Sequence, residues 1–165
     1  MSIDRYTAPA STVFEGLDQA IERITGASMR SDQIAIGESL YWGITLDELL
    51  YKAHGTRYEL ARDIDSHGAC VNGARLARNA ITHGAVLVQS IQGGLTFPMT
   101  FPVLFGAPAW LPLDRIVALA RPRASSRLSA QKASYAAHFA TRPPAEPPRK
   151  LRDWIVVAAD MGFTL

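Results

Sequence analysis

The segment 71–91 constrains the fold of this chain most, because it carries an amphipathic pattern at the helical period. Advancing about 100° per residue places its polar side chains within an arc of about 140°. These side chains are Asn72, Arg75, Arg78, Asn79, Thr82, His83, Gln89 and Ser90, with Val71 and Val86 as apolar intruders. The opposite arc is almost entirely Ala, Leu, Ile and Val, as a helix packed on a core requires. The pattern predicts a helix that reaches about Ile91.

Helical periodicity also appears on both sides of this segment. We expect helices from Ser11 or Thr12 to about Thr25, from Asp32 to about Ala53, and from about Arg57 into the amphipathic segment, with a break at Ser66–Gly68. Glu15 completes a capping box with Thr12, while Gly26 and Gly55 act as stops. Shorter helices are predicted over 114–120 and 129–141, and Pro148 can open a last one.

Two proline-rich stretches interrupt the helical patterns. Residues 93–112 are rich in aromatic residues and proline, which predicts an extended or hairpin-like excursion. Residues 142–150 read RPPAEPPRK, a linker of extended backbone. We therefore predict an all-α bundle of about five helices over residues 1–142. Residues 143–165 form the linker and a C-terminal helix, docked on the same domain or on a partner subunit.

Composition is consistent with one globular domain. The chain has 165 residues, of which 48% are hydrophobic, enough for a single core. Cys70 is the only cysteine, so we expect a buried, inert thiol, no internal disulfide and no multi-cysteine zinc site. The N-terminal sequence lacks the pattern of a secretory signal, and the prolines break the longest uncharged stretch. We expect a cytoplasmic protein without a membrane span.

Charge is distributed unevenly along the chain. Residues 1–65 hold eleven acidic against six basic residues, and residues 66–165 hold four against eleven, giving −5 and +7. No acidic residue lies between Asp65 and Asp114. A site in that segment would favour anions. The alternative is that the basic half simply packs against the acidic half.

One cluster within the amphipathic segment can carry chemistry. Arg78, Asn79 and His83 lie on its polar arc, and Asn79 is four residues from His83, where its amide could orient the imidazole. A guanidinium that binds phosphate oxygens and an imidazole that moves protons near neutral pH are the minimum for RNA cleavage without a metal. In that reaction the ribose 2′-hydroxyl attacks the adjacent phosphorus.

This cluster resembles the HEPN superfamily, whose ribonuclease members carry Arg, commonly a polar residue, and His after a gap of four to six positions. Arg78, Asn79 and His83 match that pattern, and the resemblance extends over about residues 32–91. It implies catalytic roles for these three residues. It also implies pairing of such helices across a homodimer, so that two Arg/His sets face one RNA-binding cleft. Glu38, on the preceding helix, could hold Arg78 or Arg75 in place; the alternative is a solvated acid.

Other residues compete with this interpretation or add to it. Arg62, Asp63 and His67 form a second match to the motif, but His67 adjoins a glycine where the helix is expected to break. Arg121, Arg123 and Arg127 could neutralise phosphates, although a short basic loop is usually solvated. Tyr41, Trp42 and Trp110 could stack on bases, although core positions are more common for such side chains.

The sequence thus favours a metal-independent RNA endonuclease of HEPN type without a cofactor, in a toxin or phage-defence setting. An antitoxin or another protein would be a further partner besides RNA. In this hypothesis His83 is the general acid or base, Arg78 binds the phosphate and Asn79 orients the ring. The alternative is a catalytically silent helical protein that serves oligomerisation or partner binding.

Overall fold

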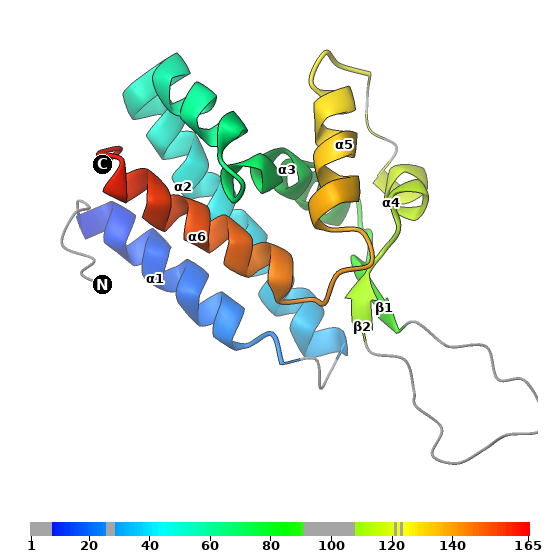
Figure 1. Ribbon diagram of the computed structural model, residues 1–165. Helices are drawn as coiled ribbons and strands as arrows, with labels where there is room; N and C mark the ends of the chain where they lie inside the picture. The colour runs from blue at the N-terminus through cyan, green and yellow to red at the C-terminus, as the bar shows by residue number, and fades with distance from the viewer. Residues whose placement is uncertain (1–7, 26–28, 91–107, 121, 123) are drawn as a thin grey trace, which may run out of the picture.

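The computed structural model describes residues 8–25, 29–90, 108–120, 122 and 124–165. These residues form six α-helices, a short 3-10 turn and one two-stranded ribbon (Figure 1). The helices are α1 (Ala8–Glu22), α2 (Met29–Ile64), α3 (Val71–Thr82), α4 (Leu113–Ala120), α5 (Leu128–His138) and α6 (Glu146–Asp160). The 3-10 turn η2 (Gly68–Cys70) leads into α3. The predicted all-α class is confirmed.

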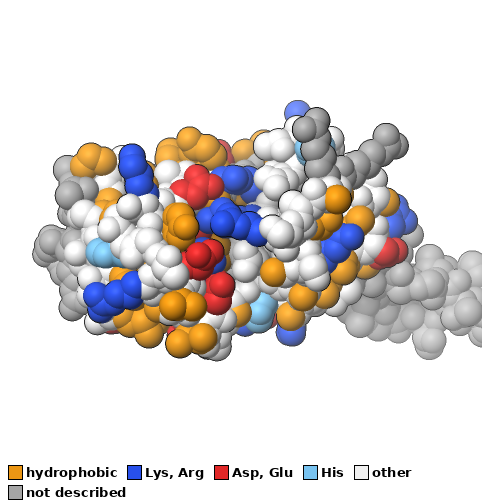
Figure 2. Space-filling model, turned by 90° about the horizontal axis from the view of Figure 1, so that it is seen from above, with side chains coloured by type: hydrophobic (Ala, Val, Ile, Leu, Met, Phe, Trp, Pro, Cys, Tyr) orange, Lys and Arg blue, Asp and Glu red, His pale blue; other side chains and the backbone are white. Residues whose placement is uncertain are grey.

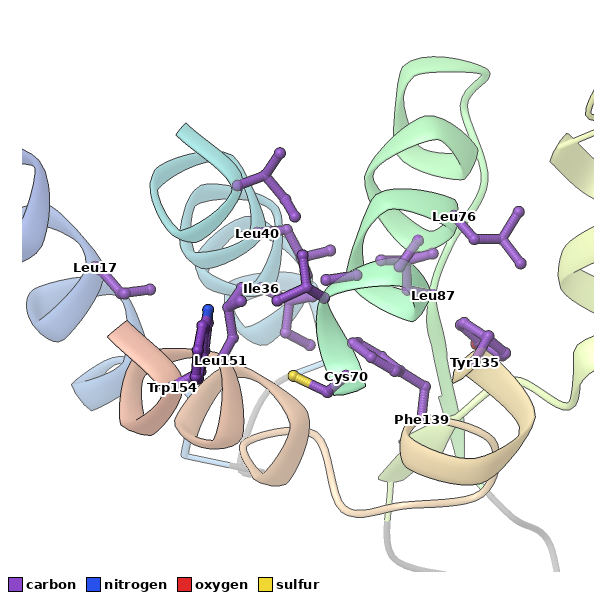
Figure 3. Packing of buried hydrophobic residues seen from close by; sticks show 14 of the residues in the cluster. Leu17, Ile36, Leu40, Cys70, Leu76, Leu87, Tyr135, Phe139, Leu151 and Trp154 are labelled. Carbon is purple, nitrogen blue, oxygen red and sulfur yellow. The ribbon is translucent and has the colours of Figure 1, made fainter. Parts of the chain in front are cut away.

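Helix α2 packs against α1, α3, α6 and the 3-10 turn η2. Helices α1 and α6 lie along one side of it, while α3 contacts α2 on one flank and α5 on the other (Figure 1). The helices enclose one core, whose buried side chains include Leu40 of α2 and Leu151 and Trp154 of α6 (Figure 3). Cys70 is fully buried in the same core. Among the described helices, none combines the length and apolar content that a membrane crossing requires.

Helix α3 ends at Thr82, so the predicted continuation to Ile91 is wrong. His83 is the C-cap and Gly84 has a φ of 80°, a left-handed conformation that glycine adopts without strain and that commonly ends a helix. The Gly84 and Ala85 amides donate back to the carbonyls of Ile81 and Ala80, at 2.8 and 3.0 Å. The last turn is thereby closed, and Gln89 and Ser90 leave the polar face of α3.

The residues after this turn form strand β1 (Val88–Ser90), which pairs antiparallel with β2 (Pro108–Trp110). Val88 lies opposite Trp110, whose buried indole Nε1 donates to the carbonyl of Pro144 at 3.1 Å. The two strands thus lie on either side of residues 91–107 and join the ends of that stretch to the bundle. Most of the predicted excursion, residues 93–107, lies outside the described residues.

Other boundaries also differ from the prediction by a few residues. Helix α1 begins at Ala8 rather than at Ser11 or Thr12, with Pro9 in its first turn, where a missing amide proton costs no helical hydrogen bond. The break predicted at Gly55 is present: this residue has the non-helical values φ 60° and ψ −141°, and a second helical stretch of α2 follows the kink and runs to Ile64. Helix α6 begins at Glu146, inside the stretch predicted as an extended linker, with Pro147 and Pro148 in its first turn.

Candidate functional site

The predicted motif lies at the C-terminal end of α3 and reaches solvent. Arg78 keeps 31% of its side chain exposed, and its Nη1 lies 3.1 Å from Oε1 of Glu48 on α2. Asn79 and His83 are exposed. Within the described part of the chain, no hydrogen bond joins the Asn79 amide to the His83 ring, and that ring makes no ion pair. Arg78 is therefore held in place, whereas His83 is held only by its backbone.

Glu38 does not hold Arg78 or Arg75, as the sequence had suggested it could. It forms an ion pair with Arg23, in the turn after α1, so its carboxylate serves the contact between α1 and α2. The carboxylates that reach α3 are Asp47 and Glu48, almost three turns further along α2. The position at which α2 and α3 cross determines this, and periodicity within one helix carries no information about it.

Arg75 belongs to a buried ionic cluster on the inner edge of the site. Its Nη2 lies 2.5 Å from Oδ2 of Asp47, a carboxylate with no exposed surface. The other oxygen, Oδ1, accepts from the Tyr58 hydroxyl at 2.8 Å and lies 3.4 Å from Nη1 of Arg62. Two guanidiniums and a phenol thus compensate one buried charge, as a buried carboxylate requires.

Tyr58 extends this cluster into the core. Burial and the adjacent carboxylate of Asp47 raise its pKa far above the ordinary value, so its hydroxyl stays protonated and donates to Asp47. The same hydroxyl accepts from the indole Nε1 of Trp154 on α6 at 2.8 Å. The position of Arg75 on α3 is therefore coupled to the packing of α6 through a continuous chain of hydrogen bonds.

A polar cavity of about 220 Å³ adjoins the Arg78–Glu48 pair. Its lining residues come from α2, α3 and the start of α5 and are Glu48, Tyr51, Glu59, Arg62, Asn72, Arg75 and Arg127. Arg127 is the one residue of the three predicted phosphate-binding arginines that the structure describes. Arg121 and Arg123 lie outside the described residues. Figure 2 shows acidic and basic side chains intermixed near the middle of one face of the molecule.

The second match to the motif is structural. Arg62 is only 4% exposed and is bound to Asp47, Asp63 and Glu59, so it is not available to a phosphate without breaking the buried cluster. His67 lies 3.6 Å from Asp65, whose carboxylate accepts from the amides of His67 and Gly68 at the entry to η2. These hydrogen bonds stabilise the turn between the end of α2 and the start of η2.

The aromatic candidates divide between core and surface. Trp110 is fully buried and Trp42 is half-buried against the core, whereas Tyr41 is exposed. None of them lines the cavity beside Arg75. Tyr51 does, with 39% of its surface exposed, and no sequence pattern singled out this residue. Only the crossing of α2 over α3 brings this ring to the site.

Chemically, this part of the molecule offers guanidiniums in two states: Arg62 and Arg75 bound to a buried carboxylate, and Arg78 and Arg127 open to solvent. An exposed imidazole lies at the end of the same helix. No group of three or more His, Cys, Asp or Glu side chains within the described ranges is arranged to hold a metal ion. Comparisons with protein-family models, with curated proteins and with solved structures found no match.

Proposed function

We propose that the exposed end of α3 is an RNA-cleaving site of HEPN type that works without a metal. The observation that carries the proposal is that Arg78, Asn79 and His83 all reach solvent at one end of one helix. Arg78 is also oriented by a carboxylate from the neighbouring helix. A cationic group with a fixed direction and a titratable ring with free access are what phosphate binding and proton transfer require.

The Arg78–Glu48 pair is compatible with phosphate binding. Glu48 is 50% exposed and Arg78 is 31% exposed, and pairs at this exposure contribute only about 0–1 kcal/mol. A phosphate that accepts two hydrogen bonds from the guanidinium can replace the carboxylate at small cost. Glu48 then acts as a positioning residue that sets the direction of the Arg78 side chain before RNA binds.

The proposed reaction is an internal transesterification. His83 takes the proton of the ribose 2′-hydroxyl while its oxygen attacks phosphorus, and the bond from phosphorus to the 5′-oxygen breaks. The leaving oxygen receives a proton from an acid, which in the proposed homodimer is the imidazole of the second copy. The products are a 2′,3′-cyclic phosphate and a 5′-hydroxyl, and Arg78 stabilises the charge that develops on the phosphoryl oxygens.

The test is cleavage of a labelled RNA in EDTA by the full-length chain. His83→Ala should lower the rate about 10²- to 10⁴-fold, the usual contribution of a general acid or base. Arg78→Ala should lower it about 10²- to 10³-fold, as for loss of one group that stabilises the transition state. Because both side chains are partly or fully exposed, the free energy of unfolding should change little.

His67→Ala is the matched control, because it removes the histidine of the second motif match. It should leave cleavage unchanged, and the 3′ ends of the products should be cyclic phosphates. Equal losses in the His67 and His83 variants, or no cleavage by the parent protein, would refute the assignment.

We infer a cytoplasmic toxin or phage-defence role from the same motif, with RNA as the principal partner. The alternative function, a silent interaction protein, is favoured by one observation. Leu60 and Ile64, four residues apart on α2, are 63% and 86% exposed and form an apolar strip on one face of the helix. This alternative would be favoured if the parent protein did not cleave RNA but self-associated, and if the Ile64→Ser variant no longer self-associated.

A further inference from the structure

The cavity beside Arg75 contains polar groups that the fold itself does not use. Within the described residues, Arg127 forms no ion pair, and the Asn72 amide and Tyr51 hydroxyl form no hydrogen bond. Arg75 Nε is buried and has no acceptor, although the rest of its guanidinium is bound. Unused donors and acceptors from three separate elements converge on a volume of about 220 Å³. That convergence points to a ligand.

The charge of the lining argues against a second phosphate. Two of the three lining arginines, Arg62 and Arg75, are already bound to Asp47. Glu48 and Glu59 lie in the same wall, and carboxylates repel an anion. A neutral, planar group with donors on one edge and acceptors on the next fits such a mixed lining better. The cavity is also smaller than the roughly 300–1,000 Å³ typical of sites for drug-sized ligands, so it suits a single base.

Among RNA bases, guanine matches the lining best. Its O6 and N7 are adjacent acceptors that one guanidinium can bind together, the commonest specific contact to this base. Its N1–H and N2–H₂ are adjacent donors that one carboxylate can accept together. Arg127 is free for the first role. Glu59 offers the second, because it is 33% exposed and only 3.5 Å from Arg62, which would hold its direction.

The remaining contacts are consistent with a nucleotide in a strand. The Tyr51 ring is 39% exposed in the cavity wall, and a base that leaves its stack usually finds an aromatic ring. Glu48 lines the cavity and also binds Arg78, so the cavity and the proposed phosphate-binding residue are joined through one side chain. A base in the cavity would thus adjoin a phosphate at Arg78.

We propose that this cavity is a guanine subsite, formed by Arg127, Glu59 and Tyr51, that seats one nucleotide of the RNA beside the scissile phosphate. The biological purpose of the subsite rests on the proposed function, but its occupancy by guanine does not depend on catalysis. Guanine binding and RNA cleavage can therefore fail separately.

The direct test is calorimetric titration of the full-length chain with guanosine 3′-monophosphate and, separately, with adenosine 3′-monophosphate. We expect the guanosine nucleotide to bind at least tenfold more tightly. Arg127→Ala and Glu59→Gln should each reduce that difference at least fivefold, because a glutamine cannot accept two donors. Arg115→Ala, an exposed arginine of α4 outside the cavity, is the matched control and should bind like the parent protein.

Equal binding of the two nucleotides, no binding of either, or the same loss in the Arg115 control would overturn the guanine subsite. Circular dichroism on each variant identifies any variant that fails to fold, and Tyr51→Leu provides a third change inside the cavity if Glu59→Gln unfolds. Cleavage of RNA at every base with no preference 5′ or 3′ to guanine would refute the subsite while leaving the nuclease intact. Guanine binding without any cleavage would refute the nuclease alone.

Discussion

At the scale of single residues, Asp47 has the largest structural consequence in the described site. Asp47→Asn keeps the shape of the side chain but removes the charge that compensates Arg62 and Arg75. Breaking a buried ion pair in this way costs about 3–5 kcal/mol, because the remaining guanidiniums stay desolvated. We expect the free energy of unfolding, measured in urea, to fall by this amount.

Glu48→Gln is the control for Asp47→Asn, since it changes the next residue on the same helix. Glu48 is half exposed, and its pairs with Arg78 and Arg75 contribute at most about 1 kcal/mol. If both variants lowered the free energy of unfolding by a similar amount, Asp47 could not be the more deeply buried of the two carboxylates.

Cys70 gives a second prediction at this scale. Its thiol is fully buried, and burial raises its pKa to about 12. The native protein at pH 8 should therefore react with a thiol-specific disulfide reagent at least 100-fold more slowly than the urea-unfolded chain. Rapid labelling of the native protein would show that the core opens locally around η2.

The raised pKa of Cys70 also predicts a pH dependence of stability. The unfolded chain loses the thiol proton at a lower pH than the folded protein does, so the free energy of unfolding should fall as pH rises above about 9.

At the scale of elements, the sequence predicted which segments are helical better than where they end. Apolar spacing indicated the earlier helices, and start and stop signals indicated the later ones. Each helix of the described residues overlaps a segment predicted as helical. The end of α3 was missed because the predicted helix ran through Gly84 to about Ile91, although a glycine after His83 is a common C-cap signal. By contrast, Gly55 correctly signals a break, because it kinks α2 and lets Tyr58 and Arg62, beyond the kink, reach back to Asp47 before it.

Close packing between elements also decides what a glycine can tolerate. A Cβ at Gly73 of α3 would lie 2.9 Å from both the Phe139 ring and the Tyr135 backbone nitrogen of α5, and a backbone atom cannot move aside. Gly73→Ala should therefore destabilise the protein by about 1–3 kcal/mol, the usual cost of overpacking, despite the better helix propensity of alanine. Thermal unfolding measures this cost.

Gly37→Ala is the matched control for this contact. Its Cβ would meet only Ile81 Cδ1, at an ordinary 3.7 Å, so the helix propensity should dominate and the protein should gain up to about 1 kcal/mol. If Gly73→Ala also stabilised the protein, α3 and α5 would have to lie further apart at Gly73 than they do in the structure.

At the scale of the whole molecule, the candidate site combines residues that no local pattern brings together. Arg78 and His83 were predictable, since they lie on one helix and share a polar arc. The partners Asp47, Glu48 and Tyr51 were not, because they depend on how α2 crosses α3. The same holds for Arg127, which the sequence placed in a basic loop and the structure places in the wall of a cavity between α2 and α3.

Trp154 tests whether this assembly is one cooperative unit. Its side chain is fully buried between α6 and α2, and it donates to Tyr58, which in turn binds Asp47. Trp154→Ala should cost about 3–5 kcal/mol, the usual loss for a large buried aromatic. Met161→Ala, at the exposed end of α6, is the control and should cost little.

The effect of Trp154→Ala should spread beyond α6, because the core is continuous from α1 to α5. Helical circular dichroism and the near-ultraviolet signal of Trp110, packed edge-to-face on Phe139 near α5, should therefore shift to the same lower midpoint in urea. Separate midpoints, with the Trp110 signal unchanged from the parent protein, would mean that α3, α4 and α5 unfold independently of α6. The chain of hydrogen bonds from Trp154 to Arg75 would then not couple the core to the candidate site.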